Sequence, residues 1–278
     1  MDLKLLPFDF SHFTFDTYLG TMKVLTYNLN GIRAATKKGL VGFFSQNEAD
    51  IVCIQETKAT EKDIDFGPFA ELGFEPYWFS AEKKGYSGVA IFTKRKPLDV
   101  VYGSGHPGFD SEGRHILLDF GTFAVQSLYA PSGTSGDIRQ TVKFEWMEFF
   151  FTYQQELQKK YPNLLLCGDY NICNHAIDIH NPKSNAKSSG FLPEEREWMT
   201  KLLSEGSLVD TFRHFYPDTP HQYTWWSQRF PSIREKNMGW RIDYILASHG
   251  MKDHLQSVQI LPEARHSDHC PMELVIGL

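Results

Sequence analysis

Polar side chains that can bind metal ions or exchange protons follow apolar runs at five places in this sequence. Each run ends at an acid, an amide or an imidazole, and the five segments are spread over the whole chain. Carboxylate and amide oxygens suit a hard divalent cation, while imidazole and amide N–H groups suit the oxygens of a phosphate ester. The assortment therefore indicates metal-assisted phosphate chemistry. The segments are Tyr27–Gly31, Ile54–Lys58, Cys167–Asn171, Trp240–Tyr244 and His266–Pro271.

Two of these segments place polar residues two positions apart. Asp169 with Asn171, and Asn28 with Asn30, would point their side chains the same way if the chain stayed extended. An acid beside an amide can activate a water molecule and steady a developing charge. The same residue types are also typical of turns. From the sequence, both the extended and the turn conformation remain open at these two places.

Two acids in the remaining segments need partners. Asp243 lies in an apolar stretch, where a carboxylate is costly to bury unless it is paired or hydrogen-bonded. His269 is the natural partner, and such a pair would fix the imidazole tautomer and favour its charged form. A purely structural Asp–His pair is the alternative. Glu56 ends its apolar run at a sheet edge, where ligands often collect, although an ion pair with Lys58 would also explain it.

The segment near the C-terminus allows two kinds of metal. Asp268 and His269 together offer a hard metal ligand and a donor for a phosphate. His266 and Cys270 stand beside them and raise the alternative of a soft-metal site. Zinc sites usually need a spaced Cys/His pattern, and no second cluster of that kind is present. The carboxylates and amides elsewhere therefore favour Mg²⁺, with Mn²⁺ as a substitute.

Aromatic residues stand next to these segments. Tyr129 closes an apolar run, and its hydroxyl could donate a hydrogen bond to a phosphate oxygen, although a packed tyrosine is the plainer interpretation. Trp225, Trp226 and Trp240 lie near late basic residues. They could form a wall that stacks on a sugar or a base. Core packing remains the alternative for one or two of them.

The elements that must position these residues can be read from apolar periodicity. Short continuous apolar runs fit strands covered on both faces, and the alternation with helices predicts an α/β layered protein with mixed sheets. The predicted strands are Met22–Asn28, Ile51–Ile54, Gly88–Thr93, His115–Phe120, Thr122–Tyr129, Leu164–Cys167, Ile242–Ala247, Ser257–Leu261 and Pro271–Ile276. The predicted helices are Lys37–Asn47, Ile138–Lys160 and Pro193–Glu205.

Composition narrows the class of protein. The chain has 278 residues, of which 41% are hydrophobic, so it can bury a large core. A net charge of −6 does not indicate a dedicated nucleic-acid binder, so any polyanion contact must come from local basic clusters. No apolar stretch reaches the length of about 20 residues that a membrane span needs. Four cysteines without a CxxC pair predict buried free thiols and a cytoplasmic location.

No composition shift divides the chain, so we expect one domain over residues 22–278. Residues 1–21 form an aromatic and polar N-terminal extension, which we expect to be flexible and which lacks the pattern of a secretion signal. Met22, directly before the first predicted strand, is a candidate natural start.

Taken together, the motifs closely resemble the exonuclease III / apurinic-apyrimidinic endonuclease family, which has the endonuclease–exonuclease–phosphatase fold. The resemblance runs from Met22 to the C-terminus, and Asp-x-Asn and Ser-Asp-His occur throughout the wider fold. Three motifs are far more specific to its DNA-repair branch. They are Gln-Glu-Thr-Lys at 55–58, Phe-Leu-Pro-Glu-Glu-Arg at 191–196 and Gly-Trp-Arg-Ile-Asp-Tyr at 239–244.

The resemblance implies a four-layer α/β sandwich, in which two mixed β-sheets pack face to face with helices outside. It implies Mg²⁺-dependent hydrolysis of phosphodiesters in double-stranded DNA, with incision 5′ to abasic sites and trimming of 3′ ends. Residues 22–278 would then be the endonuclease/exonuclease/phosphatase domain. We expect this domain to act as a monomer without a membrane partner.

The resemblance also implies roles for individual residues. Glu56 is the main metal ligand, Asp169 activates water, Tyr129 contacts the scissile phosphate, and His269, oriented by Asp243, stabilises its charge. The implied catalytic residues are Tyr129, Asp169, Asn171, Asp243 and His269. The implied metal set is Asn28, Asn30, Glu56, Asp169, Asn171, Asp268 and His269. The implied DNA-binding residues are Trp225 and Trp240, which would hold a flipped-out abasic sugar, with Arg33 and Lys58.

Some positions depart from the family pattern, notably Ser132, His175 and His266. The two histidines could narrow the pocket and favour 3′-end trimming over abasic-site incision. Two rival functions were weighed. A phosphatase or sphingomyelinase-like phosphodiesterase of the same fold is disfavoured by the tryptophans and basic stretches. A non-catalytic DNA-binding module is disfavoured because the whole set of acids, amides and histidine is present.

Overall fold

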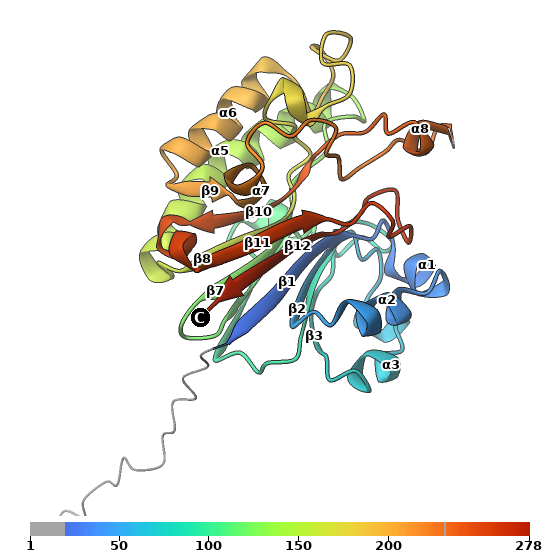
Figure 1. The fold of residues 1–278 in the computed structure, drawn as a ribbon, viewed down its shortest axis with the longest axis vertical. Helices are drawn as coiled ribbons and strands as arrows, with labels where there is room; N and C mark the ends of the chain where they lie inside the picture. The colour runs from blue at the N-terminus through green and yellow to red at the C-terminus, as the bar shows by residue number, and fades with distance from the viewer. Residues whose placement is uncertain (1–19, 231) are drawn as a thin grey trace, which may run out of the picture.

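The computed structural model describes residues 20–230 and 232–278, whose strands form two six-stranded sheets (Figure 1). The first sheet contains β1 (Thr21–Asn28), β2 (Ile51–Gln55), β3 (Glu75–Phe79), β4 (Val89–Thr93), β11 (Leu255–Ile260) and β12 (Met272–Gly277). The second contains β5 (Asp99–Tyr102), β6 (His115–Asp119), β7 (Ala124–Tyr129), β8 (Leu164–Asp169), β9 (Leu208–Asp210) and β10 (Asp243–Ser248).

Both sheets are mixed and have matching layouts. The first has the order β11-β12-β1-β2-β4-β3, and the second has the order β5-β6-β7-β8-β10-β9. In each sheet the two central strands, β1 with β2 and β7 with β8, are parallel, while the other pairs are antiparallel. The carboxyl ends of both parallel pairs carry site residues, which is the usual place for ligands in such sheets.

Helices cover the outer faces of the two sheets. Residues of α1 (Ile32–Lys37), α2 (Leu40–Asn47) and α3 (Gly67–Ala70) pack with the first sheet. Residues of α4 (Pro107–Asp110), α5 (Asp137–Lys160) and α6 (Pro193–Ser204) pack with the second (Figure 1). The remaining short elements are α7 (Thr211–Phe215), α8 (Ser232–Glu235), and the 3₁₀ helices η1 (Glu61–Asp63), η2 (Ala176–Asp178) and η3 (His249–His254). The expected four-layer α/β sandwich is therefore confirmed.

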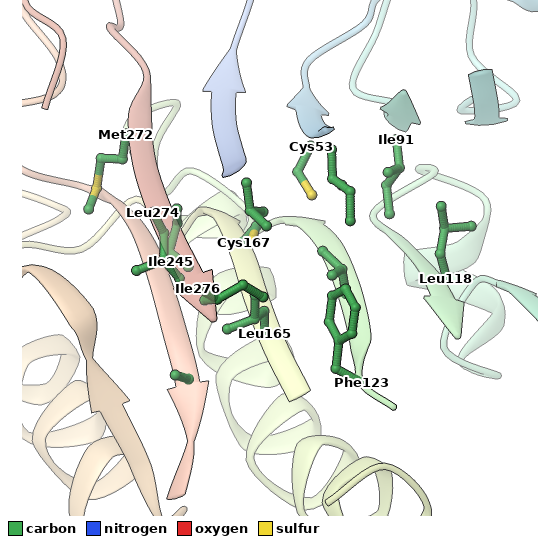
Figure 2. Close-up of a cluster of buried hydrophobic side chains, with 14 of the residues drawn as sticks. Cys53, Ile91, Leu118, Phe123, Leu165, Cys167, Ile245, Met272, Leu274 and Ile276 are labelled. Atoms are coloured by element: carbon green, nitrogen blue, oxygen red, sulfur yellow. The ribbon is translucent and has the colours of Figure 1, made fainter. Parts of the chain in front are cut away.

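The main core lies between the two sheets. Figure 2 shows Cys53 of β2 and Leu118 of β6 among the side chains that fill this space. Along β8, Leu165 and Cys167 belong to this inner core, whereas Leu164 and Leu166 pack outward with the helices. Because successive side chains on a strand point to opposite faces, a strand covered on both faces must be apolar throughout. This explains why the sequence shows continuous apolar runs rather than alternation.

The predicted strands are all present, with ends shifted by at most two residues. The long helix α5 and the helix α6 also lie where the sequence placed them. The helix predicted at Lys37–Asn47 is wrong at its start, because α1 ends at Lys37 and α2 begins at Leu40. Gly39 separates them with φ +94°, a left-handed conformation that only glycine adopts without strain.

Other sequence expectations concern the chain ends and the cysteines. The predicted N-terminal extension lies outside the described residues except for Gly20 and Thr21. All four cysteines are buried free thiols, as expected. Among the described residues, no helix is both long enough and apolar enough to cross a membrane.

Candidate active site

The site lies where the central strands of both sheets end. Across β7, β8 and β10, Tyr129 is in register with Asp169, and Asp169 is in register with Asp243. On the first sheet, Asn28 ends β1, and Glu56 directly follows β2. Regular strand pairing therefore brings side chains to one level from segments that are far apart in the sequence.

The side-chain amide of Asn28 connects the two sheets at this level. The Nδ2 atom of Asn28 donates one hydrogen bond of 2.9 Å to Glu56 Oε1 and another of 2.9 Å to Asp169 Oδ2. Asn28 is fully buried, so its bond to Asp169 is shielded from water, while its bond to Glu56 is partly buried. Because an amide nitrogen has two donors and a carboxylate accepts through either oxygen, this arrangement fixes both acidic side chains.

The paired polar residues form turns rather than extended chain. Asn171 has φ +53° and its backbone N–H donates to Asp169 Oδ1 at 2.8 Å. Asn30 has φ +48° and its backbone N–H donates in the same way to Asn28 Oδ1 at 2.9 Å. A carboxylate or amide that accepts from the backbone two residues later stabilises such a turn. The turn alternative is therefore correct at both places.

Asn171 still reaches its neighbours from within its turn. Its Nδ2 atom donates to the Ala130 carbonyl at 3.0 Å and lies 3.4 Å from Asp169 Oδ2. Glu56 also has a left-handed backbone, with φ +50°. Non-glycine residues rarely adopt positive φ, and those that do cluster at functional sites.

Burial and nearby negative charge perturb Asp169. The residue is only 1% exposed, and burial, together with Asp243 and Glu56, raises the pKa of Asp169 to about 8 against the opposing effect of His269. This value brings its proton exchange close to neutral pH, as a general acid or base requires.

His269 carries the positive charge of the site. Its Nδ1 atom lies 2.9 Å from Asp243 Oδ2, which confirms the predicted pair. Burial favours the neutral ring, but Asp243, Asp169 and Asp268 together raise the pKa of His269 to about 10. The ring is therefore charged at neutral pH, and its Nε2 lies 4.0 Å from Asp169 Oδ2.

Potential metal ligands gather beside this ring. Ligand atoms of Glu56, Asp169 and His269 lie within 4.8 Å of one another. A charged imidazole has no free lone pair, so His269 suits a phosphate better than a metal. The two carboxylates fit a hard cation such as Mg²⁺, which prefers oxygen ligands and usually binds through one or two carboxylates.

Hydrogen bonds connect two other expected ligands, Asn30 and Asp268, to each other and to Trp225. Asn30 Nδ2 donates to Asp268 Oδ1 at 2.9 Å, and Trp225 Nε1 donates to Asp268 Oδ2 at 3.0 Å. Lys58 forms a 2.7 Å ion pair with Glu56 and also donates to Asn30 Oδ1. The ion pair between Glu56 and Lys58, which was the alternative to a metal role for Glu56, is therefore present. It lies within the same cluster of polar side chains.

A hollow of about 780 Å³ opens over these groups. Trp225 and Trp240 form one wall, with ring centres 5.9 Å apart and planes nearly perpendicular. Trp226 is buried beneath Arg234 and belongs to the core instead. The hollow is lined by Glu56, Tyr129, Ser132, Gly133, Thr134, Gly136, Asp137, Gln140, Asp169, Asn171, Lys187, Ser188, Ser189, Gly190, Leu192, Trp225, Trp240, Ile242, Asp268 and His269.

Not every predicted residue lines this hollow. Arg33 is exposed and lies in a neighbouring hollow of about 790 Å³, together with Lys58. Ser132 lines the main hollow, but His175 and His266 do not. His175 caps η2 and is exposed, while His266 packs against Phe43. The prediction that these histidines narrow the pocket is therefore wrong.

Arg114, which holds Tyr129 in place, was not among the residues predicted from the sequence. Arg114 is buried, its guanidinium lies 5.0 Å from the centre of the Tyr129 ring, and its Nη1 donates to the Tyr129 carbonyl at 2.6 Å. Burial, with Glu56 and Asp169 nearby, raises the pKa of Tyr129 well above its usual value, so its hydroxyl stays protonated. An arginine directly before an apolar strand was the available signal.

Comparison with known proteins identifies the class. The Endonuclease/Exonuclease/phosphatase family matches residues 25–269, which is most of the chain. The chain belongs to this family. The predicted family is therefore confirmed, and with it the predicted enzyme class of metal-dependent phosphodiesterases.

Individual relatives sharpen this placement. An exodeoxyribonuclease of Bacillus subtilis is 41% identical over 92% of this chain and 100% of its own length. The DNA repair nuclease APEX1 of Danio rerio is 39% identical over 95% of this chain and 84% of its own length. Among solved structures, an AP endonuclease from Archaeoglobus fulgidus has a TM-score of 0.84 and 27% identity, covering 92% of this chain and 100% of its own.

Proposed function

We propose that this chain is a DNA repair nuclease that hydrolyses phosphodiesters in double-stranded DNA, cutting 5′ to abasic sites, trimming 3′ ends, or both. One observation carries the proposal. The Asn28 amide joins Glu56 and Asp169 from two sheets, beside a charged His269 held by Asp243. An acidic pair beside a fixed cation in one hollow suits a phosphate ester in its charged transition state.

We assign Mg²⁺ as the cofactor, with Mn²⁺ as a substitute. Glu56 would be the main ligand of the ion, with Asp169, Asn30 and Asp268 close by. When bound, the ion supplies positive charge that stabilises the phosphate oxygens during hydrolysis. The donor set supports this choice because Glu56 and Asp169 offer carboxylate oxygens, and all four cysteines of the chain are buried.

Asp169 is the group that takes the proton from the attacking water. Its pKa of about 8 allows it to exchange a proton near neutral pH. Its carboxylate is held at Oδ1 by the Asn171 backbone N–H and at Oδ2 by the Asn28 amide. These bonds leave little freedom for the side chain to rotate, so the base stays aimed at the hollow.

His269 and Tyr129 bind the phosphate. The charged ring of His269 uses Nδ1 for Asp243 and leaves Nε2 to donate to a non-bridging oxygen. The protonated Tyr129 hydroxyl is a second donor in the same hollow. Both donors are positioned before the substrate arrives, which is what makes such stabilisation effective.

The wall formed by Trp225 and Trp240 gives a surface for a sugar that has left the helix. Extruding a nucleotide costs least where no base is paired or stacked, so an abasic position is a favoured occupant. Arg33 and Lys58, in the adjoining hollow, would contact the DNA backbone outside the cleaved bond. One related structure, 25% identical with a TM-score of 0.84, is a 3′ phosphatase from Neisseria bound to a product DNA hairpin.

Several features of the whole protein belong to the same proposal. Residues 22–278 form one catalytic domain, since both sheets contribute to the site, and residues 1–21 precede it. The domain acts as a monomer. Buried free cysteines support a cytoplasmic location, where thiols stay reduced.

A side-by-side cleavage assay tests this function. Matched duplexes carrying an abasic site, a nick or a blocked 3′ end are incubated with the enzyme, with EDTA, and with EDTA followed by excess Mg²⁺. We expect cleavage of at least one duplex, loss with EDTA, and recovery with Mg²⁺. Hydrolysis of small phosphate esters without any cleavage of these duplexes would instead identify a phosphatase. Cleavage that persists in EDTA would refute the metal assignment.

A further inference from the structure

A buried ion pair lies directly behind the hollow, and no step proposed above uses it. Lys143 of α5 and Glu195 of α6 both have side chains that are 0% exposed, and Lys143 Nζ lies 2.6 Å from Glu195 Oε1. Burying two charges is costly, and apolar replacements of similar volume often stabilise a fold as well or better. Stability is therefore a weak explanation for this pair.

Lys143 connects the pair to the proposed water-activating group. Its Nζ donates a second hydrogen bond, of 2.8 Å, to the backbone carbonyl of Asn171. The opposite side of the same turn is held by the Asn171 backbone N–H, which donates to Asp169. The left-handed turn at Asn171 is thus held at both of its backbone groups, with Asp169 accepting from its N–H and Lys143 donating to its carbonyl.

Glu195 connects the pair to the lip of the hollow. Its Oε2 accepts from the backbone N–H groups of Gly190 at 2.6 Å and Leu192 at 3.0 Å. Its Oε1 also accepts from Gln140 Nε2 at 3.0 Å. Gly190, Leu192 and Gln140 all line the hollow, so one carboxylate sets the position of this side of it.

Gly190 completes the connection to the aromatic wall. A Cβ added at Gly190 would lie 2.9 Å from Trp240 Cζ3 and 3.0 Å from the Asn171 carbonyl oxygen. The Gly190 backbone is therefore tightly enclosed between the turn that presents Asn171 and the ring of Trp240. Contacts run without a gap from Asn171 through Lys143, Glu195 and Gly190 to Trp240.

We infer that Lys143 and Glu195 are positioning residues that fix the spacing between Asn171 and Trp240, and hence between the turn that holds the water-activating Asp169 and the sugar-binding wall. This inference rests on the proposed function, which assigns Asp169 to the attacking water and Trp240 to the sugar. Neither member of the pair touches the substrate. Their effect passes through a backbone carbonyl and a backbone amide.

The test replaces the pair by neutral groups of similar size, Lys143→Met with Glu195→Gln. This double variant avoids leaving one buried charge alone, so it should fold. A matched control removes an exposed ion pair at the C-terminal end of α6, Lys201→Met with Glu205→Gln, whose charged atoms lie 3.8 Å apart and away from the hollow. We expect the buried double variant to lose about tenfold or more in kcat, as supporting residues around sites typically do, with KM changed much less. The control should match the parent.

A coupling measurement separates positioning from general damage. Asn171→Ala is introduced into the parent and into the buried double variant. Because the pair acts through Asn171, we expect Asn171→Ala to cost several-fold less in the double variant than in the parent. Equal losses in both backgrounds, or a folded double variant with parental kcat, would overturn the inference.

A second readout does not depend on catalysis. In nitrogen-labelled, metal-free protein, we expect the double variant to shift or broaden the Trp240 indole and Asn171 side-chain amide signals. The Trp226 indole, which donates to Asn237, should stay in place. Unmoved Trp240 and Asn171 signals would overturn the inference even if no duplex is cleaved. If the parent protein itself cleaves none of the duplexes, that result counts against the proposed function but not against the positioning role of Lys143 and Glu195.

Discussion

Two nitrogen-bearing side chains hold the acids of the site in place at the scale of single residues. Asn28 donates to Glu56 and Asp169, and His269 faces Asp169 while it is paired with Asp243. Without them, the carboxylates would repel one another in a buried space. Burial and this crowding of charges together perturb the pKa values of Asp169 and His269, which lead to two predictions.

Asp169→Asn should nearly abolish cleavage while sparing DNA binding. The change removes the carboxylate that takes the proton and keeps the shape of the side chain. We expect kcat to fall about 10²- to 10⁴-fold, the range for loss of a general base, with a dissociation constant for DNA within about threefold of the parent. Exposed Asp99→Asn is the control. Near-normal turnover by Asp169→Asn would exclude its role as the base.

Asp243→Asn should lower the pKa of His269. Asp243 is the main cause that raises this pKa to about 10, so a neutral amide should lower it by more than about one unit. The ring then loses its proton at a lower pH, and the alkaline limb of the activity profile moves down. Titration of the ring by NMR in metal-free protein measures the shift, with Asp253→Asn as an exposed control. An unchanged ring pKa would mean that the pair does not set the charge.

At the scale of elements, strand register decides which side chains meet. Tyr129, Asp169 and Asp243 stand at the same level on β7, β8 and β10. Gly168, one residue before Asp169, allows these strands to approach, because an added Cβ would lie 2.0 Å from the Leu128 carbonyl oxygen. Two nonbonded atoms cannot approach so closely, so any side chain at position 168 must push β7 and β8 apart.

Gly168→Ala should therefore impair both stability and activity. We expect a loss of about 1–3 kcal/mol in the free energy of unfolding, the usual cost of overpacking, and a lower kcat because Asp169 moves relative to Tyr129. Gly42→Ala on α2 is the matched control, since nothing lies within 4 Å of its added Cβ. That control should stabilise slightly, because alanine favours a helix over glycine. Urea unfolding of both variants measures this difference. Equal free energies of unfolding for the two variants would contradict the prediction.

Among the described strands, every central strand was predicted from the sequence, whereas β11 was the only edge strand predicted, and this difference has a physical reason. Central strands such as β8 are apolar on both faces and stand out as continuous runs. The strand β3, at the edge of its sheet, contains Pro76, which lacks the N–H that a central strand would need. The edge strand β5 is only partly buried, and neither was predicted.

The same reasoning applies to the site. Residue types identified its members, because acids and amides at the ends of apolar runs are unusual. The pairing of Asp243 with His269 was predicted and is confirmed, whereas the bond between Asn28 and Asp169 was not predicted, since it joins residues 141 positions apart. The turn at Asn171 was also undecided, because its stabilising bonds come partly from Ala130, directly after β7, and from Lys143 on α5.

At the scale of the whole molecule, the two matching sheets contribute one parallel pair each to a single site. The site thus depends on the packing of the sheets and on the helices behind them. His115 at the start of β6 shows how this packing responds to pH. It is fully buried against α5, where Trp146 Nε1 donates to its Nε2 at 3.1 Å. Burial, with Arg114 nearby, lowers the pKa of His115 to about 3.

The buried His115 should make the whole fold less stable as pH falls below about 6.5, the ordinary pKa of histidine. Between pH 6.5 and about 3, His115 is protonated in the unfolded chain but stays neutral in the folded chain. The contribution of neutral His115 to the free energy of unfolding is therefore complete above pH 6.5 and shrinks below it. At pH 5 this amounts to a loss of about 2 kcal/mol.

His115→Gln keeps an acceptor for Trp146 but cannot titrate, so its stability should change less between pH 7.5 and 5. Urea unfolding at both pH values measures the difference, with exposed His214→Gln as the control. Parallel pH dependence in parent and His115→Gln would show that this histidine does not carry the effect.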